Sequence, residues 1–77
     1  MAPRYPVVSG KATKRALERA GFSLNRIVGS HHVMRKTGEP TRNVTVPIHG
    51  NRDLRRKTLK AILAQAGLSV DEFLTLL

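Results

Sequence analysis

The chain has 77 residues, and its 14 Lys and Arg against 5 Asp and Glu give a formal charge of +9. This length suffices for one small domain without a deep cofactor cleft, and the charge favours a polyanionic partner, with nucleic acid before an acidic protein. The absence of Cys and the presence of only three aromatic residues exclude disulfides, thiolate metal sites and a base-stacking platform.

The remaining composition narrows the class of protein further. The acidic residues are too few and too scattered for a two-carboxylate hydrolase or a multi-acid metal-dependent nuclease. No run of apolar residues approaches the length of a membrane span, and residues 1–10 lack the apolar core of a signal peptide. We therefore expect a cytoplasmic protein that needs no cofactor and contacts no membrane.

The first predicted element is a helix over residues 10–20, preceded by an extended leader over residues 1–8. Ser9 suits the N-cap because its hydroxyl can accept from the free amides of the first turn, and Gly21 suits the left-handed stop. Apolar residues recur between them at helical spacing, at Ala12, Ala16, Leu17 and Ala20. Residues 9–77 are expected to form a single domain.

Three strands are predicted next, over residues 22–28, 31–36 and 43–48. The first has its apolar positions on one parity, at Phe22, Leu24 and Val28, with Arg26 as an interruption. Short turns at residues 29–30 and 37–42 connect the strands into an antiparallel meander. Pro47 cannot donate to a ladder, so it belongs at a strand end or an edge.

Two helices complete the chain. The spacing of apolar residues predicts a helix over residues 55–66 that Gly67 ends, and the sequence from Ser69 to Glu72 is a capping box that begins a short third helix. Basic residues crowd the first turns of the 55–66 helix, where they oppose the helix dipole, so a functional role explains them better than helix stability does. The alternative is an ordinary solvated helix face. The basic residues are Arg55, Arg56, Lys57 and Lys60.

The order of elements defines the expected fold class. A helix, three antiparallel strands, a second helix and a short extra C-terminal helix make an α+β domain like the double-stranded-RNA-binding domain, with its helices on one face of the sheet.

The sequence Gly29-Ser30-His31-His32 is the cluster most suggestive of chemistry. An imidazole beside a phosphodiester can deprotonate a ribose 2′-hydroxyl or protonate the leaving 5′-oxygen without a metal. Alternation along a strand sends His32 to the face of the core residue Met34 and His31 to the opposite face with Arg35. His31 is therefore the candidate general acid or base, with Arg35 positioned to hold a phosphate.

Other interpretations of the same cluster are possible. Both histidines can be ordinary polar residues at a strand end. A metal site would need His49 to join them without a nearby acid, and no metal site is expected. No acid is placed to orient a histidine for Ser30 as a nucleophile, so Ser30 is expected to shape the turn or bond a phosphate oxygen.

At this point the chain resembles the HicA toxin family, also called YcfA-like proteins. Four segments carry the resemblance, in the same order along residues 9–77. These segments are 20–22 (AGF), 29–34 (GSHHVM), 44–51 (VTVPIHGN) and 59–68 (LKAILAQAGL). Many family members have Trp at position 22, an aromatic residue at position 34 and Pro-Gly at positions 56–57, where this chain departs.

The resemblance implies a function and a partner. It implies a metal-independent mRNA interferase, an endoribonuclease that cleaves transcripts and halts translation. It also implies a HicB antitoxin that neutralises the toxin in a hetero-oligomeric complex. The family's catalytic histidine follows Gly-Ser, which places it at His31.

The leading hypothesis is thus a ribonuclease toxin in which His31 transfers protons. Phosphate contacts are expected from Ser30, Arg35, Lys36, Arg55, Arg56, Lys57 and Lys60, with Lys11 and Lys14 as further candidates. One alternative is a non-catalytic RNA-binding module with the same fold and charge. Another is an adaptor whose basic face docks an acidic protein, with apolar contacts from residues 73–77.

Overall fold

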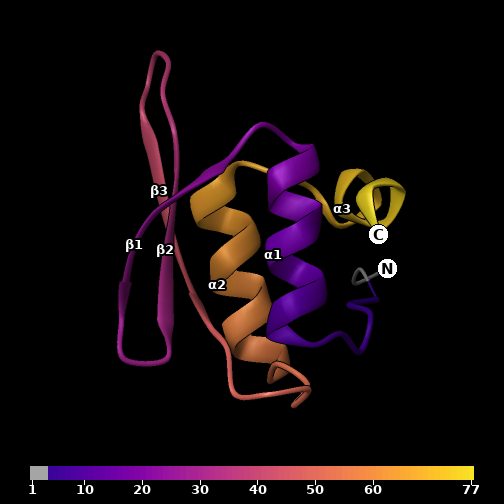
Figure 1. The fold of residues 1–77 in the computed structure, drawn as a ribbon. Coiled ribbons are helices and arrows are strands. Elements are labelled where there is room, and N and C mark those ends of the chain that lie inside the picture. Colours follow the sequence, from indigo (N-terminus) through magenta and orange to yellow (C-terminus); the bar gives the residue numbers. More distant parts are fainter. Residues whose placement is uncertain (1–3) are drawn as a thin grey trace.

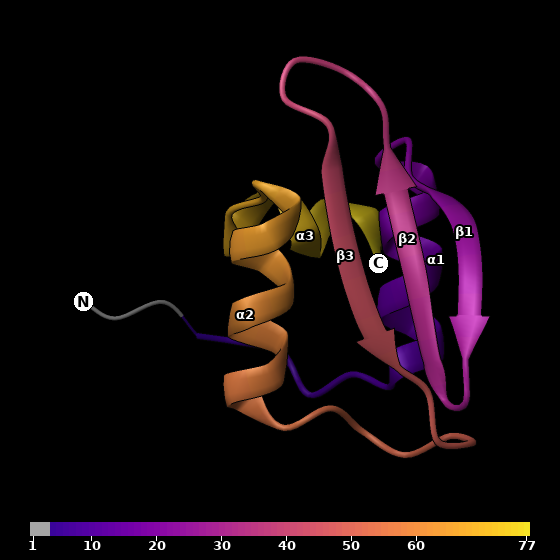
Figure 2. The same cartoon turned by 90° about the vertical axis from the view of Figure 1, so that its left-hand side faces the viewer.

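The computed structural model describes residues 4–77 and confirms the predicted α+β order. Its elements are α1 (Gly10–Arg19), β1 (Ser23–Val28), β2 (His31–Lys36), β3 (Arg42–Pro47), α2 (Arg56–Ala66) and α3 (Val70–Leu76). The strands form one antiparallel sheet in the order β1-β2-β3. Helices α1 and α2 pack on the same face of the sheet, α3 lies beyond α1, and no described element covers the other face (Figures 1 and 2).

The core lies between the sheet and the helices. The cluster that joins the sheet to α1 and α2 contains Leu17, Phe22, Met34, Val44, Val46, Ile62 and Ala66. A second cluster joins α1, α2 and α3 and contains Ala16, Leu59, Leu63 and Phe73. Tyr5 and Val8, from the segment predicted as a leader, pack against this second cluster. Residues 1–3 of that segment lie outside the described residues.

The start of α1 is held against the end of β3. The Ser9 hydroxyl accepts from the Ala12 amide at 3.1 Å, which is the predicted N-cap. Gly10 is buried, and a Cβ there would collide with the carbonyl oxygen of Pro47. Only a glycine allows this close approach of the two backbones. The contact brings the N-terminus of α1 to the end of the sheet that carries the β1–β2 turn (Figure 1).

The predicted parity of the first strand is wrong, and a bulge is the reason. Leu24 pairs with Met34, but Arg26 pairs with Val33, so Asn25 is an extra residue in β1. The extra residue switches the alternation of side chains along the strand. Leu24 therefore shares the helix-facing side with Met34, whereas Val28, which pairs with His31, lies on the open face.

The boundaries of two strands also differ from the predictions. Phe22 is buried just before β1 rather than inside it. The third strand covers residues 42–47 instead of 43–48, and the Ile48 amide donates to the Ser30 carbonyl at 2.8 Å just beyond its end, in the register of the β2–β3 pairing. Pro47 is the last residue of β3, an edge strand, as its missing amide hydrogen predicted.

Some of the basic side chains at the helix ends have a structural role, and others do not. Arg55 occupies the N-cap of α2 without a side-chain cap bond. The Arg42 guanidinium donates to the Gln65 carbonyl at 3.3 Å, and that of Arg19 donates to the Leu76 carbonyl at 2.6 Å. Both of these bonds serve carbonyls near the C-terminal ends of helices, which favour cations. None of the described helices is long and apolar enough to cross a membrane.

Candidate active site on the open face of the sheet

His31 is the first residue of β2 and lies on the open face. The turn before it has two central residues, because Val28 pairs directly with His31. Gly29 has a φ of 60° and Ser30 has no positive φ, as in a type II′ turn. The His31 side chain is exposed, and its neighbours across the sheet are Val28 on β1 and Pro47 on β3.

His32 lies on the opposite side of the same strand. It pairs with Ile27 and Val46 and shares the helix-facing side with the fully buried Met34. Its side chain is half-buried. Burial lowers the pKa of the His32 imidazole, and the positive charge of Lys14 lowers it further. The expected separation of the two histidines is therefore observed, and the sheet itself lies between the two rings.

Two arginines share the open face with His31. Arg35 lies four residues further along β2, on the same side of the strand. Arg26 lies between these two positions on the neighbouring strand, because it pairs with Val33. Arg26 was missed by the sequence analysis, which treated it as an interruption of an apolar stripe. Only the bulge after Leu24 places its side chain on this face.

A polar cavity lies beside Pro47, the neighbour of His31 on β3. It has a volume of about 330 Å³, and its lining includes His49, Arg52, Asp53 and Arg55. Arg55 was a predicted phosphate contact, and the structure brings it to the His31 end of the sheet. His49 and Arg52 were not predicted for the site. Their signal in the sequence was the charged loop after the third strand, but only the fold places that loop beside Pro47.

The other predicted phosphate contacts lie elsewhere. Lys36 ends β2 on the helix-facing side, with its ammonium 5.9 Å from the centre of the Phe22 ring. The Arg56 guanidinium lies 5.3 Å from the centre of the Tyr5 ring. Lys57 is exposed on α2, and Lys60 lines an apolar cavity. The structure thus brings Ser30 and Arg55 near His31 and places Arg35 on its face, but it disperses the remaining four cations.

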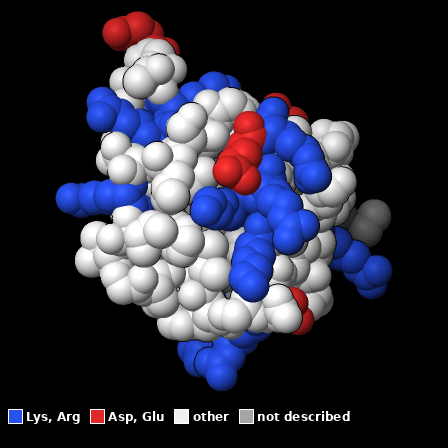
Figure 3. Space-filling model, viewed as in Figure 1, with Lys and Arg blue, Asp and Glu red and all other residues white. Residues whose placement is uncertain are grey.

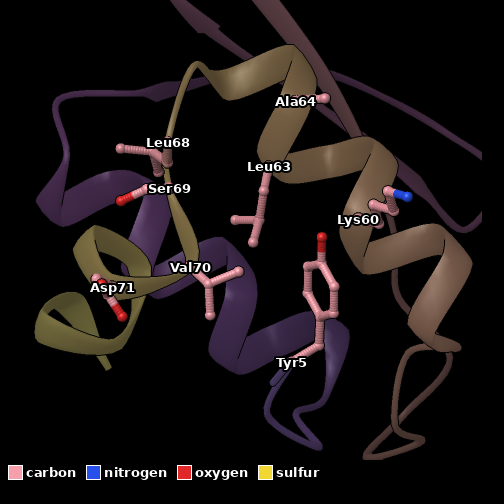
Figure 4. Close-up of a pocket in the computed structure, with 8 residues that line it drawn as sticks. All are labelled: Tyr5, Lys60, Leu63, Ala64, Leu68, Ser69, Val70 and Asp71. Carbon is pink, nitrogen blue, oxygen red and sulfur yellow. The ribbon is translucent and has the colours of Figure 1, made fainter. Parts of the chain in front are cut away.

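The cavity at Lys60 is a poor candidate for chemistry. Its volume is about 400 Å³, and it lies between α2, the start of α3 and the N-terminal segment. Tyr5, Leu63 and Val70 point into the same space (Figure 4). Asp71 and Lys60 are the only charged residues in its lining. In residues 4–77, no three His, Asp or Glu side chains lie close enough together to hold a metal ion.

Fold and site together define a small, strongly basic α+β domain that presents a histidine at one end of an open sheet face. A family model described as the HicA toxin of bacterial toxin-antitoxin systems matches residues 10–68. The match spans well over half of the chain, and the protein belongs to the HicA toxin family. A comparison with curated proteins finds no match.

Proposed function

We propose that this toxin is an endoribonuclease that cleaves messenger RNA in the cytoplasm, with His31 transferring protons at the scissile phosphodiester. The observation that carries the proposal is the position of His31. Its imidazole is exposed on the open face, with Arg26 and Arg35 on the same face and the cavity of Arg52 and Arg55 beside Pro47. In phosphodiester transfer an imidazole can move the protons, and guanidinium groups can stabilise the developing charge.

The reaction is a transfer within the RNA chain. The ribose 2′-oxygen attacks phosphorus and loses its proton, the bond to the 5′-oxygen breaks, and that oxygen takes up a proton. The products are a 2′,3′-cyclic phosphate and a 5′-hydroxyl. His31 takes the proton from the 2′-hydroxyl, and His49, in the adjacent cavity, is the candidate donor to the leaving oxygen.

The cations have distinct parts in this scheme. Arg26 and Arg35 hold the phosphates of RNA that lies across the open face, and Arg52 and Arg55 stabilise the charge that develops on phosphorus. Ser30 shapes the turn, since its carbonyl accepts the Ile48 amide hydrogen. We assign its hydroxyl to a phosphate oxygen. Lys36, Arg56, Lys57 and Lys60 add to the long-range attraction of RNA.

A HicB antitoxin is the proposed protein partner, in a hetero-oligomeric toxin-antitoxin complex. The cationic face around His31 attracts an acidic inhibitor as well as RNA. We therefore place the antitoxin over this face, where it would exclude RNA from His31.

The test is cleavage of a labelled transcript by His31→Ala in the presence of EDTA. The variant is expected to lose about 10²–10⁴-fold in rate, the usual contribution of proton transfer by a positioned side chain. Because His31 is exposed, the variant should keep its fold, and the cations around it should keep the variant bound to the antitoxin. A folded His31→Ala protein that still cleaves RNA and arrests growth contradicts the assignment.

Two further variants refine the test. His49→Gln is expected to slow cleavage, because it removes the proposed proton donor. His32→Ala is expected to keep most of its kcat, because that ring lies on the other side of the sheet. If the wild-type protein binds the transcript but leaves it intact, the protein is a non-catalytic RNA-binding module. If it binds an acidic partner but no RNA, it is an adaptor.

A further inference from the structure

A second cationic pocket lies on the helix side of the sheet. Residues 11, 14, 15 and 18 of α1 share one face of the helix, and with His32 and Ile48 they line a pocket of about 300 Å³. Three of these α1 residues are basic, namely Lys11, Lys14 and Arg15, and Glu18 is acidic. Basic side chains gather over α1 around an acidic one in Figure 3, which views the molecule from this side.

This arrangement of cations weakens the helix. Lys11 and Lys14 lie in the first half of α1, where the helix dipole disfavours positive charge, and the first turn contains no acidic residue. Lys11 also repels Lys14 and Arg15, because residues three and four apart are neighbours on a helix surface. A bound anion would relieve both effects.

His32 adds a neutral donor to the pocket. Its Nδ1 atom is buried and has no hydrogen-bond partner among the described residues. A buried nitrogen without an acceptor is best left unprotonated, so the neutral ring carries its proton on Nε2. The Nε2 hydrogen is then available to an oxygen atom in the pocket that the ring lines.

We propose that the pocket formed by Lys11, Lys14, Arg15 and His32 binds a phosphate group of the RNA backbone, at a site separate from the scissile phosphate at His31. The inference rests on the proposed function, since it takes RNA as the ligand. Lysine, arginine and an imidazole N–H recognise phosphate oxygens and no particular base, so the site holds RNA without regard to sequence.

The position of the pocket suits one continuous RNA strand. Gly10 packs against Pro47, and Pro47 neighbours His31, so the N-terminus of α1 and the active face meet at one end of the molecule. An RNA strand that passes around the Gly29-Ser30 turn would reach His31 on one side of the sheet and the α1 pocket on the other. The pocket therefore contributes to the binding of RNA rather than to its cleavage.

The pocket also couples RNA binding to the protonation of His32. Burial and Lys14 lower the pKa of His32, so its ring is neutral at pH 7. A phosphate in the pocket offsets the charge of Lys14 and favours the protonated ring, which raises that pKa. The charged residues that line the pocket with His32 are Lys11, Lys14, Arg15 and Glu18, all from α1. Binding should accordingly tighten as the pH falls below neutrality, and His32→Ala should remove this tightening.

The experiment measures the affinity of the full-length protein for a 2′-O-methyl RNA oligonucleotide, which lacks the attacking hydroxyl and cannot be cleaved. The double variant Lys14→Gln/Arg15→Gln should bind about tenfold more weakly, and its plot of log K against log salt should be shallower by about 0.7, the contribution of one single-strand phosphate contact. Glu18→Gln should bind more tightly, because it removes the acid from the pocket.

Arg4→Gln/Lys57→Gln is the control for charge, because it also removes two exposed cations and neither of them lines the pocket. If the two double variants bind equally, general attraction accounts for the effect and the pocket is not a phosphate site. A shift of the His32 ring resonances with inorganic phosphate but not with the oligonucleotide would also overturn the proposal, because it would assign the pocket to free phosphate.

Cleavage kinetics separate this inference from the proposed function. The double variant should raise the KM for RNA and keep kcat, whereas His31→Ala should lose kcat. Loss of cleavage in His31→Ala together with unchanged KM in the double variant would retain the proposed function and reject the phosphate pocket. A wild-type protein that binds no oligonucleotide would contradict both.

Discussion

At the scale of single residues, the backbone of Gly29 decides how His31 is presented. Gly29 has a φ of 60°, a conformation that residues with a Cβ rarely adopt, and it comes two residues before His31. A Cβ at Gly29 would meet no atom within 4 Å. A substitution there therefore tests backbone conformation alone, without a steric clash.

Gly29→Ala is expected to cost about 1 kcal/mol of folding free energy, because a Cβ disfavours the left-handed conformation. It should also lower the cleavage rate, because relief of the strain moves the turn that holds His31. Gly38→Ala is the matched control for stability, since Gly38 also has a positive φ, of 156°, with no atom nearer than 3.9 Å to an added Cβ, and it lies in the turn between β2 and β3, away from His31. Urea denaturation and cleavage assays of both variants check this. Equal cleavage rates in the two variants would contradict the role of the turn.

At the scale of elements, α3 is defined by its own first residues. The Ser69 hydroxyl accepts from the Glu72 amide at 3.1 Å, and the Glu72 carboxylate accepts from the Ser69 amide at 3.0 Å. This is the predicted capping box. The hydrogen bonds from Ser69 lower the pKa of Glu72, because they favour the charged carboxylate.

The stability of the protein should depend on pH through Glu72. A carboxylate whose pKa is lowered in the folded state stabilises the fold at any pH above 4.5, its ordinary pKa. This contribution is lost as the pH falls through the lowered pKa. Glu72→Gln should lose that part of the dependence. Denaturation between neutral and strongly acidic pH measures it. Asp71→Asn, which changes the adjacent exposed acid, should keep this pH dependence of stability. The same loss in both variants would contradict the capping box as its cause.

At the scale of the whole molecule, the last helix is part of the core. The family match ends at residue 68, before α3 begins. Phe73 of α3 is nevertheless fully buried in one cluster with Ala16, Leu59 and Leu63. α3 therefore completes the packing between α1 and α2, and Arg19 ties its last turn to α1 through the Leu76 carbonyl.

Phe73→Ala is expected to cost about 3–5 kcal/mol, the usual loss for a large aromatic side chain in a core. That loss approaches the total stability of a small domain, so the thermal transition should fall steeply or disappear. Leu74→Ala, at a neighbouring side chain that is 45% exposed, should have a much smaller effect. Similar melting temperatures for both variants would show that α3 is dispensable. Phe73→Leu keeps the measurement possible if Phe73→Ala does not fold.

Local patterns in the sequence were sufficient for the elements and for placing His31 and His32 on opposite faces of the sheet. The spacing of apolar residues, the caps at Ser9 and Ser69 and the stops at Gly21 and Gly67 are local signals, and the helices follow them. Alternation along one short strand was enough to separate His31 from His32. These predictions succeeded because each depends on residues only a few positions apart.

Other features of the site depend on contacts between distant segments, and only the tertiary structure decided them. The bulge after Leu24 reverses the faces of β1 and brings Arg26 to the open face, which no count of alternating residues reveals. The approach of Gly10 to Pro47 brings α1, the 48–55 loop and the turn of His31 to one end of the molecule. The sequence by itself determined which side chains carry charge and chemistry. Packing decided which of them meet, because backbone register and close approach join residues that are far apart in the chain.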